Sequence, residues 1–347
     1  MAEIVRIDGG LGEGGGQILR TALALAALCQ QPVELVNIRA RRRKPGLRPQ
    51  HLAAVQALAA ITGGAVEGAA EHSRCLLFTP GAIRGGSFRF AVGTAGATTL
   101  VLAAILPPLL FARESSTITI IGGTHVPFSP PFPYLDGVFL PALQSLGGRL
   151  RASLDRWGWY PEGGGVLRAA ITPGAGLRAL RRTERGLMHK LSLLVARSNL
   201  PAGIAAREEA VVRNRLAAAG YDVQSRLVEA PANGSGNLVF LRGLFGGGAV
   251  GFGALGRRGL PAEQVAAQVC RQWLAFAAGK AAMDCWLADQ LVLYLALAAG
   301  ESELAVDGLT AHLLTNIAVI ERFLPVRFVL DHDRGRVRVT GCGWGGA

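Results

Sequence analysis

His312 is the residue of this chain best suited to covalent chemistry, and it opens the apolar run A-H-L-L-T-N-I-A-V-I-E-R-F-L-P. An imidazole can attack phosphorus through one ring nitrogen while the other nitrogen orients the ring, and the phosphoramidate that forms is easily broken again. The alternative is that a histidine near a helix start is a cap or a satisfied core residue. The context that favours chemistry comes from the other end of the chain.

A glycine-rich turn near the N-terminus supplies that context. Glu13-Gly14-Gly15-Gly16-Gln17 precedes apolar residues at helical spacing, so we expect a turn that leads into a helix N-terminus, where backbone N–H groups suit phosphate oxygens. Arg20 falls on nearly the same helical face as Gln17. Glu13 is costly among phosphate-facing amides unless a metal ion or an arginine offsets its charge. The glycine spacing fits neither a Walker loop nor a dinucleotide fingerprint, and a tight turn without a ligand is the alternative.

A basic segment, R-A-R-R-R-K-P-G-L-R-P-Q-H, runs from Arg39 to His51. Its prolines and glycine favour a rigid loop that holds Arg39, Arg42, Arg48 and Gln50 at fixed angles, as bidentate phosphate recognition requires. A solvated basic loop is the alternative. The formal net charge of +12 also indicates a polyanionic partner, which could be nucleic acid, a nucleotide or a phosphorylated metabolite.

Composition is typical of a compact cytoplasmic protein. The 347 residues suffice for one large core and a smaller one, and only 17% are charged. We expect no membrane span, because no run of about 18 apolar residues is present. The start M-A-E-I-V-R does not resemble a signal peptide. The five cysteines form no C-x-x-C pair, which predicts buried thiols in a reducing compartment.

A repeat organises the chain into three β-α-β-α-β type units, beginning near Gln17, Thr98 and Met283. Alanine- and leucine-rich helices alternate with short β-branched strands, so we predict an α/β fold with helices packed on sheets. Residues 184–279 do not follow this repeat and lie between the second and third units. We therefore expect a large domain from residues 1–183 and 280–347, and a smaller inserted α/β domain from residues 184–279.

The inserted segment has its own predicted order of elements: a strand at Lys190–Ala196, a helix at Gly203–Ala219, strands at Asp222–Glu229 and Leu238–Gly243, a hairpin at Gly246–Gly248 and a helix at Pro261–Ala278. We expect a structural role for it. Arg257 and Arg258 are the only indication of direct RNA contact.

These segments together resemble the RNA 3'-terminal phosphate cyclase family over nearly the full length of the chain. Six blocks in the same order carry the resemblance: Glu13–Arg20 (E-G-G-G-Q-I-L-R), Arg39–His51, Gly93–Gly96 (G-T-A-G), Gly122–Thr124 (G-G-T), Leu287–Gln290 (L-A-D-Q) and His312–Phe323.

The resemblance implies an ATP-dependent ligase that acts in RNA processing and converts an RNA 3'-phosphate end into a 2',3'-cyclic phosphodiester. His312 would take AMP from ATP, pass it to the 3'-phosphate, and the neighbouring 2'-OH would then displace AMP. The implied partners are ATP, a divalent metal (Mg or Mn) and RNA with a 3'-phosphate end. The sequence leaves open whether the chain forms a homodimer.

The resemblance also assigns roles to matching positions. Glu13 resembles the metal ligand beside the triphosphate, and the catalytic group would be His312 with Arg20, Arg39 and Arg42. The nucleotide would contact Glu13, Gln17, Pro130, Tyr134, Trp286, Asp289 and Gln290, and the RNA end Arg39, Arg42, Gln50 and His51. Trp286 replaces a tyrosine that the family places against adenine, with Pro130 over the other face. An indole can stack on a base equally well, although Trp286 could instead be a core aromatic.

Some positions depart from the family pattern. Ala103 or Ala104 stands where a glutamine near the metal is expected, Pro133 replaces an acidic residue, and His125 follows G-G-T in place of a small polar amide. Two alternatives remain: an inactive RNA-binding relative, and an enolpyruvyl transferase, which shares the repeated architecture but forms no adenylylated histidine.

Overall fold

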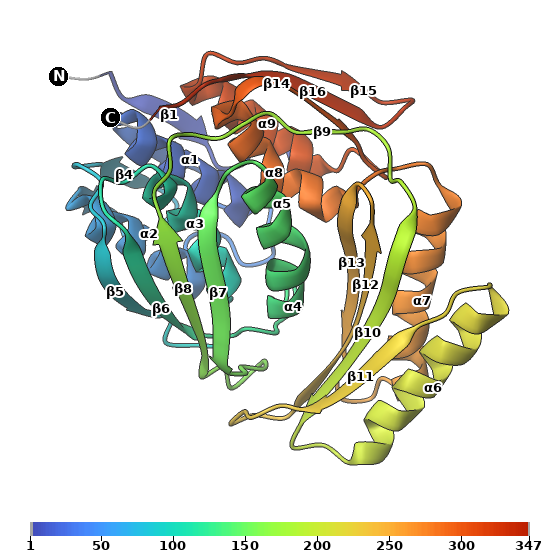
Figure 1. Ribbon diagram of the computed structural model, residues 1–347. Coiled ribbons are helices and arrows are strands. Elements are labelled where there is room, and N and C mark those ends of the chain that lie inside the picture. The colour runs from blue at the N-terminus through green and yellow to red at the C-terminus, as the bar shows by residue number, and fades with distance from the viewer. Residues whose placement is uncertain (1–2, 346–347) are drawn as a thin grey trace.

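The computed structural model describes residues 3–345 and consists of four small sheets with helices packed against them (Figure 1). Three of the sheets follow one design, and the fourth belongs to the inserted segment. The predicted α/β class, with helices on sheets, is confirmed.

The first unit shows the design. It comprises β1 (Val5–Asp8), α1 (Gly16–Cys29), β2 (Val33–Val36), α2 (Pro49–Thr62), β3 (Ala65–Glu67) and β4 (Leu76–Thr79). Strands β1 and β2 are parallel, and the antiparallel β4 and β3 complete a sheet of order β1-β2-β4-β3. The parallel pair needs a crossover, which α1 provides.

The second unit repeats this order as β5-β6-β8-β7. Its elements are β5 (Gly86–Ala91), α3 (Thr98–Leu110), β6 (Ser116–Gly122), α4 (Phe132–Tyr134), the π-helix η1 (Leu135–Phe139), α5 (Leu140–Ser145), β7 (Arg149–Arg156) and β8 (Gly165–Thr172). The elements α4, η1 and α5 together take the place of α2.

The third unit has the same order, β9-β14-β16-β15, so the predicted repeat is present three times. It comprises β9 (Arg181–Arg182), α8 (Cys285–Leu297), β14 (Ala299–Ala305), α9 (Ala311–Phe323), β15 (Phe328–Asp331) and β16 (Arg336–Cys342). The insertion follows β9 and therefore lies inside the third unit, whereas we expected it between the second and third. A two-residue strand is too short to show an alternating pattern, which explains the error.

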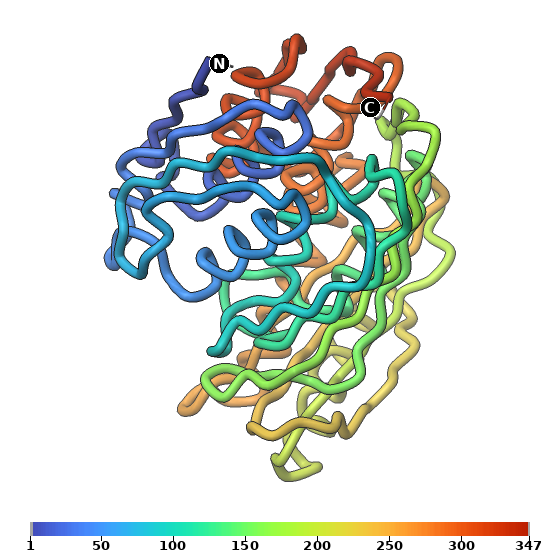
Figure 2. The backbone as a smooth tube through the Cα atoms, turned by 90° about the vertical axis from the view of Figure 1, so that its left-hand side faces the viewer, coloured from blue at the N-terminus to red at the C-terminus, as the bar shows by residue number. Residues whose placement is uncertain are grey.

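The inserted segment forms its own sheet of order β11-β10-β12-β13. Its elements are β10 (Met188–Ser198), α6 (Ala202–Ala218), β11 (Gln224–Glu229), β12 (Gly236–Phe245), β13 (Gly248–Leu255) and α7 (Ala262–Ala278), which match the predicted elements closely. Helices α6 and α7 cover one face around a separate apolar cluster that includes Trp273. In both views the segment lies at the opposite end of the molecule from the first unit (Figure 2). On this basis we propose that residues 184–279 are a separate small domain.

Helices from the three units pack together in the main core. Helix α1 contacts α2, α3 and α9, and α8 packs on α9. Residues Ile18–Leu28 of α1 are almost all buried, because alanine and leucine stabilise a helix and allow it to be surrounded on all sides. This packing brings α9, from the last unit, against α1, from the first.

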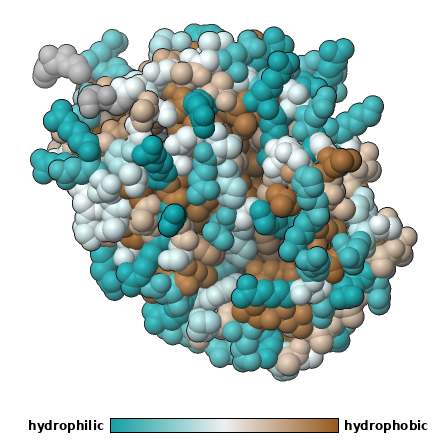
Figure 3. Space-filling view, viewed as in Figure 1, coloured by the Kyte–Doolittle hydropathy of each residue, from teal (hydrophilic) through white to brown (hydrophobic). Residues whose placement is uncertain are grey.

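The face of the molecule shown in Figure 3 carries hydrophilic and apolar side chains intermixed. Within residues 3–345, no helix has both the length and the apolar character needed to cross a membrane.

Candidate active site

The glycine turn lies against the start of α9, so two segments from opposite ends of the sequence meet. Glu13 Oε2 is 2.8 Å from His312 Nε2, and the Glu13 N–H donates to Thr315 Oγ1 at 3.2 Å. Thr310 caps α9 by accepting the N–H of Leu313 at 2.9 Å, which fixes the first turn that carries His312. The His312 side chain is 48% exposed and is therefore accessible to a ligand.

The Glu13 carboxylate binds two cationic or polar groups at once. Its Oε2 also accepts from Arg42 Nη2 at 2.6 Å. Burial alone would raise the pKa of Glu13, but His312 and Arg42 outweigh burial and hold the pKa below its usual value. The carboxylate is therefore ionised at neutral pH.

The other oxygen of Glu13, Oε1, is buried and has no hydrogen-bond partner among residues 3–345. A buried carboxylate oxygen without a partner suits a hard divalent cation. The described part of the chain gathers no group of three or more histidine, cysteine or acidic side chains around a metal position. Glu13 therefore fits a Mg²⁺-type site in which one carboxylate is joined by oxygens of a bound phosphate.

Arg20 and Gln17 lie side by side on α1, as predicted, and Arg20 Nη2 donates to Gln17 Oε1 at 2.8 Å. Burial lowers the pKa of Arg20 to about 10, so its guanidinium is still charged at neutral pH. His51 is only 3% exposed, and its Nδ1 accepts the N–H of Arg48 at 3.1 Å. Burial, together with Arg20, Arg39 and Arg48, lowers the pKa of His51 to about 3, so the ring is neutral.

His51 packs beneath the glycine turn at Gly16. A Cβ on Gly16 would lie 2.5 Å from His51 Nε2 and 3.1 Å from Arg20 Nη1, so only glycine allows the ring to approach the backbone this closely. The first turn of α1 therefore lies beside Arg20 and close to Arg42, an arrangement that suits phosphate oxygens. Because His51 is buried, it supports the turn from below and is not itself accessible to an RNA end.

The basic loop is held in shape by its own groups. Arg39 has a φ of 56°, and its Nη1 donates to the carbonyl oxygens of Lys44 and Gly46 at 2.7 and 2.9 Å. Gln50 Oε1 accepts the N–H of Ala97 at 3.3 Å and so ties α2 to the residue that follows the G-T-A-G segment. These contacts provide the rigidity that the prolines indicated. Arg39 is engaged with its own loop, unlike Arg42, which reaches Glu13.

Asp289 on α8 joins this cluster through hydrogen bonds that hold α8, α9 and α1 together. Its Oδ1 accepts from Thr310 Oγ1 at 2.7 Å, and its backbone oxygen accepts from Asn316 Nδ2 at 3.0 Å. Asn316 Oδ1 in turn accepts from Thr21 Oγ1 at 2.7 Å. Burial raises the pKa of Asp289 to about 7, against the opposing influence of Thr310 and His312. The sequence analysis did not identify Thr21, Thr310 or Asn316, although Asn316 lies within the block His312–Phe323.

Trp286 lies in the first turn of α8 with its side chain partly exposed, at 42%. Its ring meets Phe252 edge to face at 5.8 Å, and Gln290 Nε2 donates to its backbone oxygen at 3.0 Å. It is therefore not a fully buried core aromatic and keeps surface for a stacking partner. Pro130 is anchored at its carbonyl oxygen, which accepts from Thr99 Oγ1 at 2.9 Å.

Tyr134, expected at the nucleotide, lies in the core instead. It is 4% exposed, and its hydroxyl donates to Asp284 Oδ1 at 2.5 Å. Asp284 caps α8 by accepting the N–H of Leu287 at 3.0 Å and also accepts the N–H of Gly251 at 3.3 Å. Tyr134 therefore fixes the start of the helix that carries Trp286.

The positions that depart from the family pattern add no charged side chain to the candidate site. His125 is 1% exposed, its ring stacks on Trp157 at 3.9 Å, and burial lowers its pKa to about 3. Ala103 is partly buried and Ala104 fully buried on α3, and Pro133 lies within α4. An alanine offers no side-chain oxygen, so neither Ala103 nor Ala104 can replace a metal-binding glutamine.

Comparison with known proteins identifies what this arrangement is similar to. The family model described as RNA 3'-terminal phosphate cyclase matches residues 11–330. Among curated relatives, the RNA 3'-terminal phosphate cyclase of Ralstonia nicotianae is 45% identical over 96% of this chain and 95% of its own length. That of Pyrobaculum neutrophilum is 43% identical over 98% and 99%, and that of Methylococcus capsulatus 44% over 99% and 95%.

Among solved structures, an EPSP synthase from Acinetobacter baumannii aligns over 99% of this chain and 67% of its own. Its TM-score is 0.35 at 12% identity, which is too low to support any argument. The family match and the curated relatives cover nearly all of the chain, including the glycine turn and His312. The chain belongs to the RNA 3'-terminal phosphate cyclase family.

Proposed function

We propose that the protein is an enzyme that uses ATP to convert an RNA 3'-phosphate end into a 2',3'-cyclic phosphodiester. The observation that carries this proposal is the contact between His312 and Glu13, with Arg42 on the same carboxylate. It joins a nucleophile from the last unit to a phosphate-binding turn from the first.

In the first step a nitrogen of His312 attacks the α-phosphorus of ATP. A bond forms between nitrogen and phosphorus, the bond from the α-phosphorus to the bridging oxygen breaks, and pyrophosphate leaves. The N–H groups at the start of α1, Arg20 and Arg42 are the donors that would hold the phosphate oxygens. Nε2 is the nitrogen bound to Glu13, so attack from Nε2 requires that this contact open first.

In the second step an oxygen of the RNA 3'-phosphate attacks the phosphorus of the histidine–AMP, and the nitrogen–phosphorus bond breaks. In the third step the 2'-OH loses its proton to water, its oxygen attacks the 3'-phosphorus, and AMP leaves as the cyclic ester closes. The 2'-OH is adjacent to its target, so the ring closure gains from proximity.

Glu13 Oε1 is the atom that would hold a divalent cation beside the triphosphate. Such a cation, when bound, neutralises the charge that develops on the leaving phosphate. Trp286 offers a partly exposed indole for adenine, with Gln290 supporting its backbone. A cytoplasmic location stays a prediction from the sequence, and the homodimer stays open.

A labelling experiment tests the proposal. The protein is incubated with α-labelled ATP and Mg²⁺ or Mn²⁺ and then denatured, and we expect acid-labile, base-stable label on the chain. His312→Ala should abolish it, whereas His332→Ala, an exposed histidine between β15 and β16, should not. Label from γ-labelled ATP, or label that persists in His312→Ala, would contradict the proposed nucleophile.

A further inference from the structure

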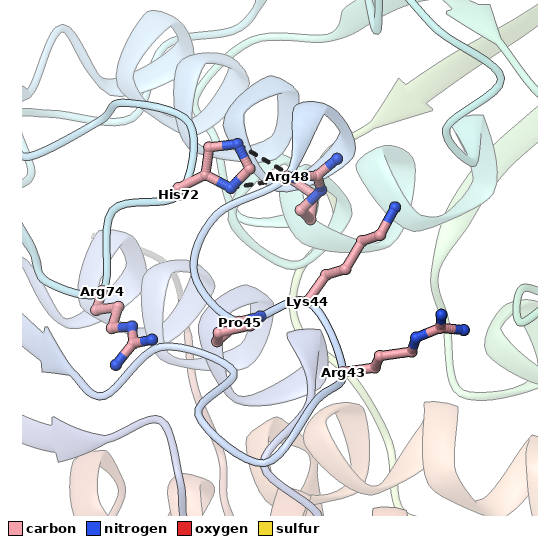
Figure 4. Close-up of a pocket in the computed structure, with 6 residues that line it drawn as sticks. All are labelled: Arg43, Lys44, Pro45, Arg48, His72 and Arg74. Carbon is pink, nitrogen blue, oxygen red and sulfur yellow. Dashed lines mark hydrogen bonds between the residues drawn. The ribbon is translucent and has the colours of Figure 1, made fainter.

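A second cationic site lies beside the catalytic cluster, on the other side of the basic loop. A pocket of about 560 Å³ opens there, and it is lined by Arg43, Lys44, Pro45, Arg48, His72 and Arg74 (Figure 4). Its volume falls within the range of about 300–1,000 Å³ that small-ligand sites occupy. None of the proposed catalytic steps uses this pocket.

The pocket carries positive charge that the protein itself does not neutralise. Arg48 is paired with Glu71 at 3.2 Å. Arg43, Lys44 and Arg74 are exposed, and none of them forms an ion pair with any of residues 3–345. No carboxylate lines the pocket. Three uncompensated cations around one concave surface favour an anionic ligand.

The walls of the pocket are fixed to each other through the backbone. Leu47 N–H donates to Ser73 O, and His72 N–H donates to Leu47 O, each at 2.9 Å. Gly46 has a φ of 76°, and a Cβ there would clash with the carbonyl oxygen of His72. His72 itself has a φ of 69°, a conformation that is uncommon for any residue except glycine and usually needs support from its surroundings. The two segments therefore form a preorganised wall.

The same loop connects this pocket to the catalytic cluster. Arg42, which binds Glu13, is followed directly by Arg43 and Lys44 of the pocket. At the other end of the loop Arg48 lines the pocket and also bonds through its N–H to His51, which lies beneath the glycine turn. An anionic chain whose end reaches His312 would thus meet Arg42 and then the pocket.

We propose that this pocket binds backbone phosphates of the RNA strand, upstream of the 3'-phosphate that reacts. The inference rests on the proposed function, since it assumes that RNA is the substrate. Arginine and lysine contacts to phosphates position a strand without reading its sequence, so the pocket would favour longer RNA over short RNA at any sequence.

The experiment compares 3'-phosphorylated oligonucleotides of increasing length, from the shortest that the wild type cyclises. In the double variant Lys44→Gln, Arg74→Gln we expect KM for long RNA to rise at least threefold, and about tenfold at low salt. The slope of log KM against log salt should flatten by about 1.4, because each lost cation accounts for about 0.7 on single strands. The shortest substrate should show no such change.

A charge control is Arg338→Gln, which removes one exposed cation that forms no ion pair within residues 3–345 from the sheet of the third unit and should leave all substrates unaffected. Labelling of His312 by ATP alone separates this inference from the proposed function. If the wild type takes no label, the proposed function fails. If labelling and cyclisation are normal and the double variant handles long RNA as the wild type does, the pocket does not bind RNA. Weakened labelling of the double variant by ATP alone would overturn the assignment to RNA and assign the pocket to the nucleotide.

Discussion

The hydrogen bond between Thr21 and Asn316 should be the connection that aligns α1 with α9. The two side chains are 4% and 2% exposed and lie 295 positions apart in the sequence, and their oxygens are 2.7 Å apart. Asn316→Ala would remove the acceptor of the Thr21 O–H and one donor to the backbone oxygen of Asp289. Leaving a buried polar group unpaired costs about 1–3 kcal/mol, so we expect a loss of about 1–3 kcal/mol in the free energy of unfolding.

A double-mutant cycle measures how much of this loss belongs to the pair. Thr21→Val keeps the shape of the side chain and removes only its hydroxyl, which leaves Asn316 Oδ1 unpaired. Each single variant breaks the same hydrogen bond. The double variant should therefore lose less free energy of unfolding than the sum of the two single variants, by about 1 kcal/mol or more. Urea unfolding followed by circular dichroism gives the free energies. If two transitions appear, the cycle applies to the one that Asn316→Ala shifts.

One result of the double-mutant cycle would contradict a role for this hydrogen bond. Costs that add within about 0.3 kcal/mol would mean that the two residues act independently, and the alignment argument would be wrong. Adenylylation supplies a second measurement. If the bond aligns α9, both single variants should also slow the labelling of His312, since His312 lies in the first turn of that helix.

Three further outcomes are expected from other contacts. Burial raises the folded-state pKa of Asp289 from 3.8 to about 7, so the folded state keeps a proton that the unfolded state loses. The stability that this retained proton gives to the folded state is therefore lost as pH rises from about 4 to 7. Asp289→Asn should reduce the resulting fall in melting temperature with pH over that interval. Tyr134→Phe removes the hydroxyl that bonds buried Asp284 and should cost about 1.5–3 kcal/mol, as measured by chemical unfolding. Gly16→Ala forces a Cβ to within 2.5 Å of His51 Nε2, and by overpacking it should cost about 1–3 kcal/mol and reduce adenylylation, as the labelling assay will report.

Controls for these variants come from the same chain. Gly203→Ala tests the glycine substitution itself, because a Cβ there would meet nothing within 4 Å. Comparable destabilisation by Gly16→Ala and Gly203→Ala would remove the steric argument. A pH profile of Asp289→Asn that matches the wild type would show that Asp289 does not titrate in this interval. Normal stability of Tyr134→Phe would mean that its hydroxyl does not stabilise the capping carboxylate.

The sequence predicted the class of fold and the repeated design, because helix and strand periodicity is a local property. Both helices of the inserted segment, α6 and α7, start and end within a residue of their predicted limits. The insertion was expected between the second and third units but lies inside the third, since β9, which has only two residues, pairs with β14 far along the chain. Periodicity over two residues carries no signal.

For the site, the sequence blocks identified the candidates but not their partners. His312 and Glu13 were selected for chemical reasons, and the structure brings their side chains to 2.8 Å. The positioning residue Asn316 was missed because its partner Thr21 lies in a distant unit. The burial of Tyr134 depends on packing around Asp284, which no spacing along the chain reveals.

The meeting of α1 with α9 has a consequence for biosynthesis. A ribosome makes the glycine turn about 300 residues before it makes His312. A nascent chain that has reached only the first unit carries the proposed phosphate-binding turn without the proposed nucleophile. Under the proposed function, adenylylation therefore has to wait until α9 has been made and has docked on α1.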